Sequence, residues 1–236
     1  MRVALVQMNS GSDAEQNLAT IEARVAEGAA RGARLVALPE NATLLARPVD
    51  RVARAEALDG PTVARLGRLA RRHGVWISLA GFPERTDDPA RTANASLLLG
   101  PDGALAAVYR KIHLFDLSLP ELTLCESATT RPGDALVVHP IDGVPVGLSI
   151  CYDLRFPELY RALVRAGARV LLVPSAFTVP TGKAHWEVLL RARAIENQAY
   201  VVAAAQCGAH PGSERVSFGH GLAVDPWGRV LVDQGE

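Results

Sequence analysis

Residues 146–158 read VGLSICYDLRFPE and join a predicted buried strand to a predicted helix. The apolar half ends at Ile150 and has the pattern of a strand, whereas Pro157 followed by Glu158 is typical of the first turn of a helix. The turn between them carries Cys151. Open α/β sheets bind ligands at the carboxyl ends of their strands, and a nearby helix N-terminus favours a thiolate, so this position favours a reactive cysteine. The alternative is that Cys151 is a small buried apolar side chain, as most free cysteines are.

The same succession of strand and helix repeats on both sides of this turn. Apolar strands are expected at residues 2–6, 35–38, 75–80, 169–173 and 200–205, and helices after Ser12, Asp59, Pro157 and Lys183. Ser12 and Glu15 form a predicted capping box at the start of the first helix. Because strand, helix and strand in succession make the unit of parallel pairing, the sequence predicts an α/β fold.

Turn residues divide the other strands into three predicted hairpins. They are centred on Pro101-Asp102-Gly103, on Asp142-Gly143 and on Asp225-Pro226-Trp227-Gly228. Residues 112–133, between the first two hairpins, have no hydrophobic period. A loop of that length within a compact domain is usually functional or disordered.

The composition is that of a globular protein with a substantial core. Among 236 residues, 49% are apolar, and the formal net charge is zero. Bulk electrostatics therefore favour neither nucleic acid nor an anionic membrane as a partner. No linker interrupts the pattern, so residues 1–236 are expected to form a single domain. The chain closes on residues 233–236 directly after a strand, which suggests that a C-terminal extension is missing.

The cysteines bear on the cellular compartment. Cys125, Cys151 and Cys207 are widely spaced and make neither a disulfide framework nor a zinc motif. The apolar N-terminus is too short for a signal peptide, and no stretch approaches the ~20 apolar residues of a membrane span. We therefore expect a cytoplasmic protein without a metal site.

Three apolar strands end in a residue that ionises, namely Glu40, Lys111 and Cys151. Taken singly, each has an ordinary explanation, because strand ends meet water. Together they suit acyl transfer: Glu40 would take the proton of the thiol, and an ammonium at Lys111 would stabilise the oxyanion of a tetrahedral intermediate. We therefore expect the three side chains to meet at one site.

The segments around these residues resemble the three signatures of the nitrilase superfamily of carbon–nitrogen hydrolases, in the family's order. They are Leu38-Pro39-Glu40, Tyr109–His113 and Cys151–Glu158, and further similarity extends over Pro174–Phe177, Thr181–Asn197 and Asp225–Gly228. The resemblance covers nearly the whole chain and is closest to the Nit branch. It implies a four-layer α-β-β-α sandwich that associates into homodimers or larger homo-oligomers.

By this resemblance, Cys151 is the nucleophile, Glu40 is the general base and Lys111 stabilises the oxyanion. A second glutamate, which would position Lys111, corresponds to Glu126, and Glu121 is the alternative position. The implied reaction hydrolyses the amide of a small carboxylate-bearing substrate, foremost deaminated glutathione, to an acid plus ammonia or an amine through a cysteine thioester. The resemblance implies no cofactor.

The resemblance also assigns contacts to the substrate. Arg155 and Thr181 would contact its carboxylate, and the backbone N–H of Tyr152 would help to hold the oxyanion. The planar fork of an arginine suits a bidentate carboxylate contact. The alternative for Arg155 is a salt bridge with Asp153 or Glu158.

The same residues are compatible with other functions. The close alternative is an ω-amidase acting on α-keto acid amides, and an alternative of another class is a catalytically silent module that binds a partner. Reactive side chains at all four chemical positions argue against the silent module. A pairing of Cys151 with His185, as in papain-like proteases, is less favoured than a packing or hydrogen-bonding histidine. No Gly-rich pattern supports nucleotide binding.

Overall fold

The computed structural model describes residues 1–119 and 122–236. The first half contains β1 (Val3–Leu5), α1 (Ala14–Ala30), β2 (Leu35–Ala37), α2 (Pro48–Ala53), α3 (Pro61–His73), β3 (Trp76–Arg85), β4 (Thr92–Leu99), β5 (Leu105–Arg110), β6 (Asp116–Leu119) and β7 (Leu122–Cys125). The second half contains the 3₁₀ helix η1 (Glu126–Ala128), β8 (Thr130–Arg131), β9 (Val138–Ile141), β10 (Val144–Leu148), η2 (Cys151–Arg155), α4 (Pro157–Arg165), β11 (Val170–Leu172), α5 (Val179–Asn197), β12 (Tyr200–Ala203), β13 (Cys207–Ala209), β14 (Val216–Phe218), β15 (Leu222–Val224) and β16 (Val230–Asp233).

Two sheets dominate the described part of the chain. The first has the order β1-β2-β3-β4-β5, with β8 beside β4, and the second has the order β16-β15-β12-β11-β10-β9. The strand pairs β1/β2, β2/β3, β10/β11 and β11/β12 are parallel, as the succession of strands and helices predicts. The three predicted hairpins are confirmed as the antiparallel pairs β4/β5, β9/β10 and β15/β16.

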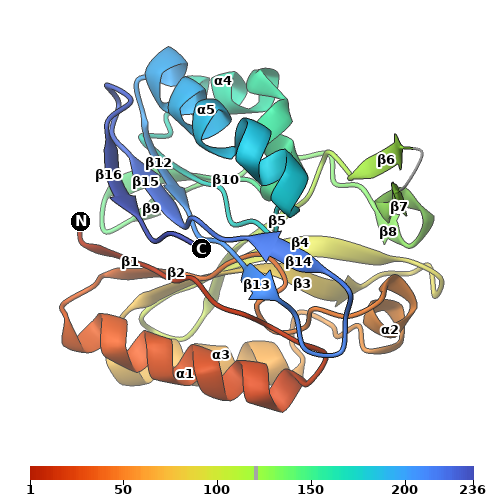
Figure 1. Ribbon diagram of the computed structural model, residues 1–236. Coiled ribbons are helices and arrows are strands. Elements are labelled where there is room, and N and C mark those ends of the chain that lie inside the picture. The colour runs from red at the N-terminus through yellow and green to blue at the C-terminus, as the bar shows by residue number, and fades with distance from the viewer. Residues whose placement is uncertain (120–121) are drawn as a thin grey trace.

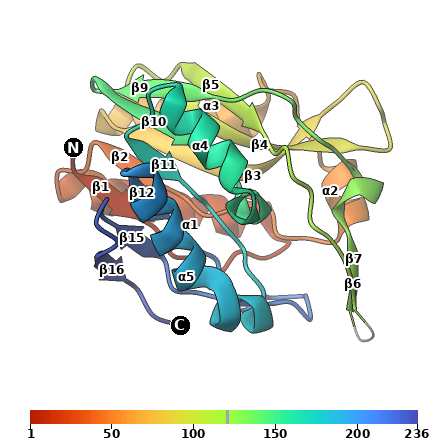
Figure 2. The same ribbon diagram turned by 90° about the horizontal axis from the view of Figure 1, so that it is seen from above.

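The sheets lie face to face between two pairs of helices. Figure 1 shows α1 and α3 on the outer side of the first sheet and α4 and α5 on the outer side of the second, and Figure 2 shows α4 and α5 from above. Alternate residues of β2 face opposite layers: Leu35 packs in the core between the sheets, and Val36 packs in the core under α1 and α3. The predicted four-layer α-β-β-α sandwich is therefore observed.

Several local expectations differ from the structure. The first helix is capped by Asp13, whose side chain accepts the N–H of Gln16, rather than by Ser12. The short helix α2 and the pair β13/β14 had no periodic pattern that predicted them. Residues 112–133 contain two paired strands, β6 and β7, although the sequence indicates only a loop there. None of the helices in the described residues is long and apolar enough to cross a membrane.

Candidate active site

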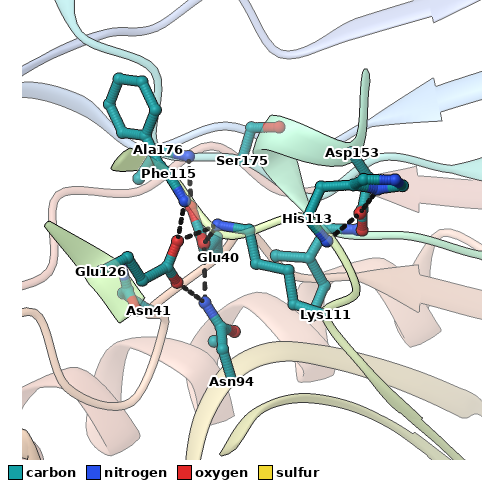
Figure 3. A network of polar contacts seen from close by, with 12 residues as sticks. Glu40, Asn41, Asn94, Lys111, His113, Phe115, Glu126, Asp153, Ser175 and Ala176 are labelled. Carbon is teal, nitrogen blue, oxygen red and sulfur yellow. Dashed lines mark hydrogen bonds and ion pairs between the residues drawn. The ribbon is translucent and has the colours of Figure 1, made fainter. Parts of the chain in front are cut away.

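The three strand-end residues come together where the two sheets face each other. Glu40 follows β2, Lys111 follows β5 directly, and Cys151 follows β10. Figure 3 shows Lys111 reaching toward the carboxylates of Glu40 and Glu126. Glu40 is 4% exposed and Lys111 is 2% exposed, so their charges are held away from bulk water.

Glu40 is fixed through both of its carboxylate oxygens. Oε1 accepts hydrogen bonds from Asn94 Nδ2 at 3.1 Å and from Lys111 Nζ at 3.4 Å. Oε2 accepts the backbone N–H of Ala176 at 3.2 Å. Ala176 lies beside the second sheet. Its neighbour Ser175 donates its N–H to the carbonyl oxygen of Ala204, the residue that follows β12. The carboxylate therefore bridges the two sheets.

The turn that carries Glu40 depends on a glycine of the neighbouring strand. Asn41 has φ +60°, and Gly81, at a bulge in β3, has φ +74°. A Cβ on Gly81 would lie 2.0 Å from Asn41 N, which no side chain can occupy. Arg51 secures the same turn by donating to Asn41 Oδ1 at 2.6 Å and to Gly81 O at 2.9 Å. The close approach of the two backbones thus sets the direction in which Glu40 points.

Glu126 is the closest anionic partner of Lys111. The two form an ion pair with 2.7 Å between Nζ and Oε2, and the same oxygen accepts the N–H of Phe115 at 2.7 Å. Burial alone would raise the pKa of Glu126, but the charge of Lys111 and the hydrogen-bond donors outweigh it and lower the pKa. Burial likewise opposes the charge of Lys111, yet Glu126 and Glu40 raise the pKa of its ammonium. Glu121, the alternative second glutamate, lies outside the described residues.

Cys151 is the first residue of η2, at the sharp turn that follows β10. Its φ is +48°, a left-handed value that is uncommon for a non-glycine residue and that clusters at functional sites. Its N–H donates to Pro174 O at 3.0 Å, which joins the turn to the segment that holds Glu40. The side chain is buried within the core between the sheets, at 8% exposure. The sulfur is therefore presented from a strained, well-fixed backbone.

The expectation of a thiolate stabilised by a helix N-terminus was wrong. Burial raises the pKa of the Cys151 thiol, and the negative charge of Glu40 raises it further, although Lys111 and the N–H of Ala176 oppose them. The helix α4 begins only at Pro157, and η2 lies between. Because the charged form is disfavoured in a buried site, the thiol keeps its proton at neutral pH. A base must then remove the proton as the sulfur reacts.

Asp153 links the turn at Cys151 to the segment that carries Lys111. The Asp153 side chain is fully buried. Its Oδ2 accepts Tyr109 Oη at 2.7 Å and the N–H of Ile150 at 2.8 Å, and its Oδ1 accepts the N–H of His113 at 3.1 Å. His113 Nδ1 lies 2.8 Å from the same Oδ1. One carboxylate therefore fixes the residue before the cysteine together with residues on both sides of Lys111.

Arg155, an expected substrate contact, ends η2, the short helix that Cys151 begins. Arg155 Cζ is 5.7 Å from the ring centres of both Tyr152 and Phe177, and its Nη1 lies 3.3 Å from His185 Nδ1. Among the ion pairs of the described residues, none joins Arg155 to Asp153 or Glu158, so the salt-bridge alternative was wrong.

Thr181 occupies the first turn of α5. Its hydroxyl lies 2.8 Å from Thr178 Oγ1 and donates to Thr178 O at 3.3 Å. That hydroxyl is therefore already engaged at the start of the helix. His185 is exposed on α5 and contacts Arg155, and its ring makes no hydrogen bond to Cys151 among the described contacts.

The sequence reasoning missed three groups that hold the site. Asn94 in β4 contacts both carboxylates, the N–H of Ala176 contacts Glu40, and Asp153 was considered only as a partner of Arg155. The one signal for Asn94 was an amide in the middle of a predicted buried strand. Within the described ranges, no group of three or more His, Cys, Asp and Glu side chains is placed to hold a metal ion.

Known proteins resemble this chain over nearly its whole length. The family model described as carbon-nitrogen hydrolase matches residues 2–236. The chain belongs to the carbon–nitrogen hydrolase family. It is 48% identical over 237 residues to human deaminated glutathione amidase, with 98% of this chain and 72% of that protein covered. The resemblance read from the motifs is thereby confirmed.

Solved structures agree with the fold of this carbon–nitrogen hydrolase. The NitFhit protein of C. elegans has a TM-score of 0.91 and 42% identity, over 99% of this chain and 57% of that longer chain. An amidase from Nesterenkonia sp. AN1 has a TM-score of 0.85 and 28% identity, over 100% of this chain and 89% of that one. The latter structure, a glutamate-to-glutamine variant, shows Michael addition of acrylamide at the active-site cysteine of that amidase.

Proposed function

We propose that this carbon–nitrogen hydrolase is a thiol amidase that cleaves the amide of deaminated glutathione through a thioester on Cys151. The observation that carries the proposal is the ammonium of Lys111 held between the carboxylates of Glu126 and Glu40, beside the turn of Cys151. The choice of substrate is supported by the name of the human relative, deaminated glutathione amidase.

Acylation begins with a neutral thiol, because burial and Glu40 raise the pKa of Cys151. Glu40 takes the thiol proton while the sulfur attacks the amide carbonyl, so the proton and the nucleophile move together. Lys111 and the backbone N–H of Tyr152 stabilise the oxyanion. Donors of this kind are worth ~3–4 kcal/mol each in measured enzymes. Glu40 then returns the proton to the leaving nitrogen, and ammonia or an amine departs.

Deacylation uses the same carboxylate. Glu40 removes a proton from water, the water oxygen attacks the thioester carbon, and the C–S bond breaks. The sulfur regains a proton and the carboxylic acid product leaves. Two half-reactions through one covalent intermediate give ping-pong kinetics, with a burst if deacylation is the slower step.

Glu126 has a different role from Glu40 in this scheme. Its pKa is lowered, so it remains ionised and is a poor proton acceptor at neutral pH. Its 2.7 Å contact instead keeps Lys111 charged and aimed into the site. The two glutamates therefore divide the work of proton transfer and of positioning the ammonium.

Substrate binding is proposed to involve Arg155 and Thr181. Arg155 is partly buried beside two aromatic rings, where a carboxylate contact is less screened than on an open surface. A substrate carboxylate would replace the weak contact between Arg155 and His185. Because the Thr181 hydroxyl lies at the N-terminal turn of α5, it can turn from Thr178 to a carboxylate without moving the helix.

The cellular setting and assembly are also proposals. The free cysteines of the described chain fit the reducing cytoplasm. Two exposed apolar side chains of α5, Val188 and Ile195, suit burial in a homodimer or larger homo-oligomer. Light scattering during gel filtration measures the mass of the assembly directly.

The test of the proposed function is a substrate panel with two matched amides. Deaminated glutathione and α-ketoglutaramate both yield 2-oxoglutarate, so one coupled assay compares kcat/KM for the two. We expect higher kcat/KM for deaminated glutathione and no turnover by Cys151→Ala, with the fold of that variant intact. The reverse order identifies an ω-amidase. No turnover of any amide favours the partner-binding module and contradicts the proposal.

A further inference from the structure

Asn94 contacts every charged group that surrounds the ammonium of Lys111. It lies in β4, is 4% exposed, and its Nδ2 donates to Glu40 Oε1 at 3.1 Å and to Glu126 Oε1 at 2.9 Å. Its backbone carbonyl accepts the N–H of Lys111 at 2.9 Å. Figure 3 shows its amide pointing toward both carboxylates. One residue therefore holds the backbone of the lysine and both of its anionic partners.

Only one orientation of the Asn94 amide fits this site, with its nitrogen facing the two carboxylates. An Asn nitrogen donates two hydrogen bonds and cannot accept one, so it suits two ionised carboxylates. A flipped amide would place its carbonyl oxygen against both negative charges. In the part of the chain that the structure describes, the buried Oδ1 of Asn94 accepts no hydrogen bond. The nitrogen of Asn94, and not its oxygen, therefore makes the contacts to the two carboxylates.

The contacts form a closed ring. Lys111 Nζ bonds to one carboxylate on each side, and Asn94 Nδ2 bonds to the same two carboxylates. Two negative charges and one positive charge meet in this ring, beside the thiol of Cys151. A neutral amide that donates to both carboxylates holds them apart without adding a charge. A carboxylate in its place would add like-charge repulsion, and an apolar side chain would leave two oxygens without a donor.

We propose that Asn94 is a positioning residue, which fixes the distance between Glu40 and Glu126 and keeps both as hydrogen-bond acceptors during amide hydrolysis. The inference rests on the proposed function. Asn94 contacts no reacting atom and acts through the two glutamates. Its loss should therefore affect kcat more than KM, because the substrate carboxylate is bound elsewhere, at Arg155.

The experiment compares Asn94→Leu, Asn94→Asp and the control Ser96→Ala by steady-state kinetics from about pH 6 to about pH 9. Ser96 lies two residues further along β4, is buried, and has no hydrogen-bond partner among the described residues. We expect Ser96→Ala to match wild type and Asn94→Leu to lose about 100-fold in kcat, the size of loss that follows small misplacement of catalytic groups.

The pH profile separates a positioning role from a general loss of structure. In Asn94→Asp, the introduced carboxyl faces Glu40 and Glu126, which also interact with the charges of Lys111 and Arg51, and Glu40 lies beside the thiol of Cys151. While protonated it donates one hydrogen bond, and when ionised it donates none. We therefore expect kcat of Asn94→Asp, divided by kcat of wild type, to fall as pH rises. The same ratio for Asn94→Leu should not change with pH.

Two results would overturn the inference. One is a kcat for Asn94→Leu within about threefold of wild type, and the other is parallel pH profiles for Asn94→Asp and wild type. If Asn94→Leu does not fold, as judged by circular dichroism, the profile of Asn94→Asp decides alone. Wild-type turnover is measured first. A wild-type protein that hydrolyses no amide contradicts the proposed function. An active wild type with equally active Asn94 variants contradicts only the positioning role.

Discussion

The ammonium of Lys111 lies 2.7 Å from Oε2 of Glu126, the glutamate that the family resemblance predicts as the residue positioning Lys111. Lys111 is buried at the end of β5, and Glu126 opens η1 after the β6/β7 pair. The pair puts a permanent positive charge beside a buried thiol and the carboxylate of Glu40. That arrangement suits stabilisation of an oxyanion in a site from which water is excluded.

Removal of the ammonium should affect both activity and stability. Lys111→Met leaves two buried carboxylates side by side without their cation, which costs about 3–5 kcal/mol when one partner of a buried ion pair is lost. We expect kcat to fall by about 10²–10³-fold. Urea unfolding and steady-state kinetics measure the two effects. Lys183→Met, at an exposed lysine of α5, is the stability control, and equal unfolding free energies for the two variants would refute the prediction.

Glu126 should make stability depend on pH in the acid range. Its pKa in the folded protein is lowered from 4.5, so the stabilisation is present above pH 4.5 and is lost as pH falls through the folded-state pKa. The difference in unfolding free energy between wild type and Glu126→Gln should therefore be largest near neutral pH and shrink below pH 4.5. Denaturant titrations at several pH values measure it. A difference that is constant with pH would show that ionised Glu126 does not stabilise the fold.

Asp153 should influence catalysis without contacting substrate. Asp153→Asn replaces an acceptor oxygen by an NH₂ group that faces donors from Tyr109 and Ile150 or from His113. We expect a stability loss of about 2–4 kcal/mol, because buried donors lose their acceptor, together with a clear fall in kcat/KM.

Tyr109→Phe is the matched control for Asp153, because it leaves the carboxylate in place and removes only the Tyr109 hydroxyl, which donates to Oδ2 at 2.7 Å and accepts the N–H of Ile112 at 3.2 Å. It should cost about 1–2 kcal/mol and leave most activity. Thermal unfolding and kcat/KM are measured for both variants. Equal kcat/KM for Asp153→Asn and Tyr109→Phe would argue that the carboxylate does not hold the site together.

Two glycines with similar backbone angles give a test of the turn at Glu40. Gly74 ends α3 at φ +63°, and a Cβ added there would have no atom within 4 Å, whereas a Cβ on Gly81 meets Asn41 N at 2.0 Å. Gly74→Ala should cost about 1 kcal/mol from backbone strain alone and keep full activity. Gly81→Ala should cost more and lower kcat/KM as well, because the turn that carries Glu40 must move. Identical behaviour of the two variants would disprove the close approach.

Prediction from sequence succeeded where a local pattern marks a strand end. Glu40, Lys111 and Cys151 each follow an apolar run, and their chemical types together predicted a shared site, although β10 belongs to a different sheet from β2 and β5. Asn94 lies inside β4 and contacts residues 54 and 32 positions away, which no local spacing encodes. The nearby helix start predicted a lowered pKa for the Cys151 thiol. Burial, which depends on all the atoms around the sulfur and not on local sequence, raises that pKa instead. Residues 112–133 lack periodicity because their strands are short, and β6 and β7 pair with each other outside the two main sheets.

The central claim is that Cys151 carries the acyl group during turnover. Acid quenching of the enzyme during hydrolysis of deaminated glutathione, followed by mass spectrometry of its peptides, tests this directly. We predict an acyl adduct on the peptide that contains Cys151 and none on Cys125 or Cys207, and no adduct in Cys151→Ala. Turnover by wild type without an adduct on Cys151, or turnover retained by Cys151→Ala, would contradict the account.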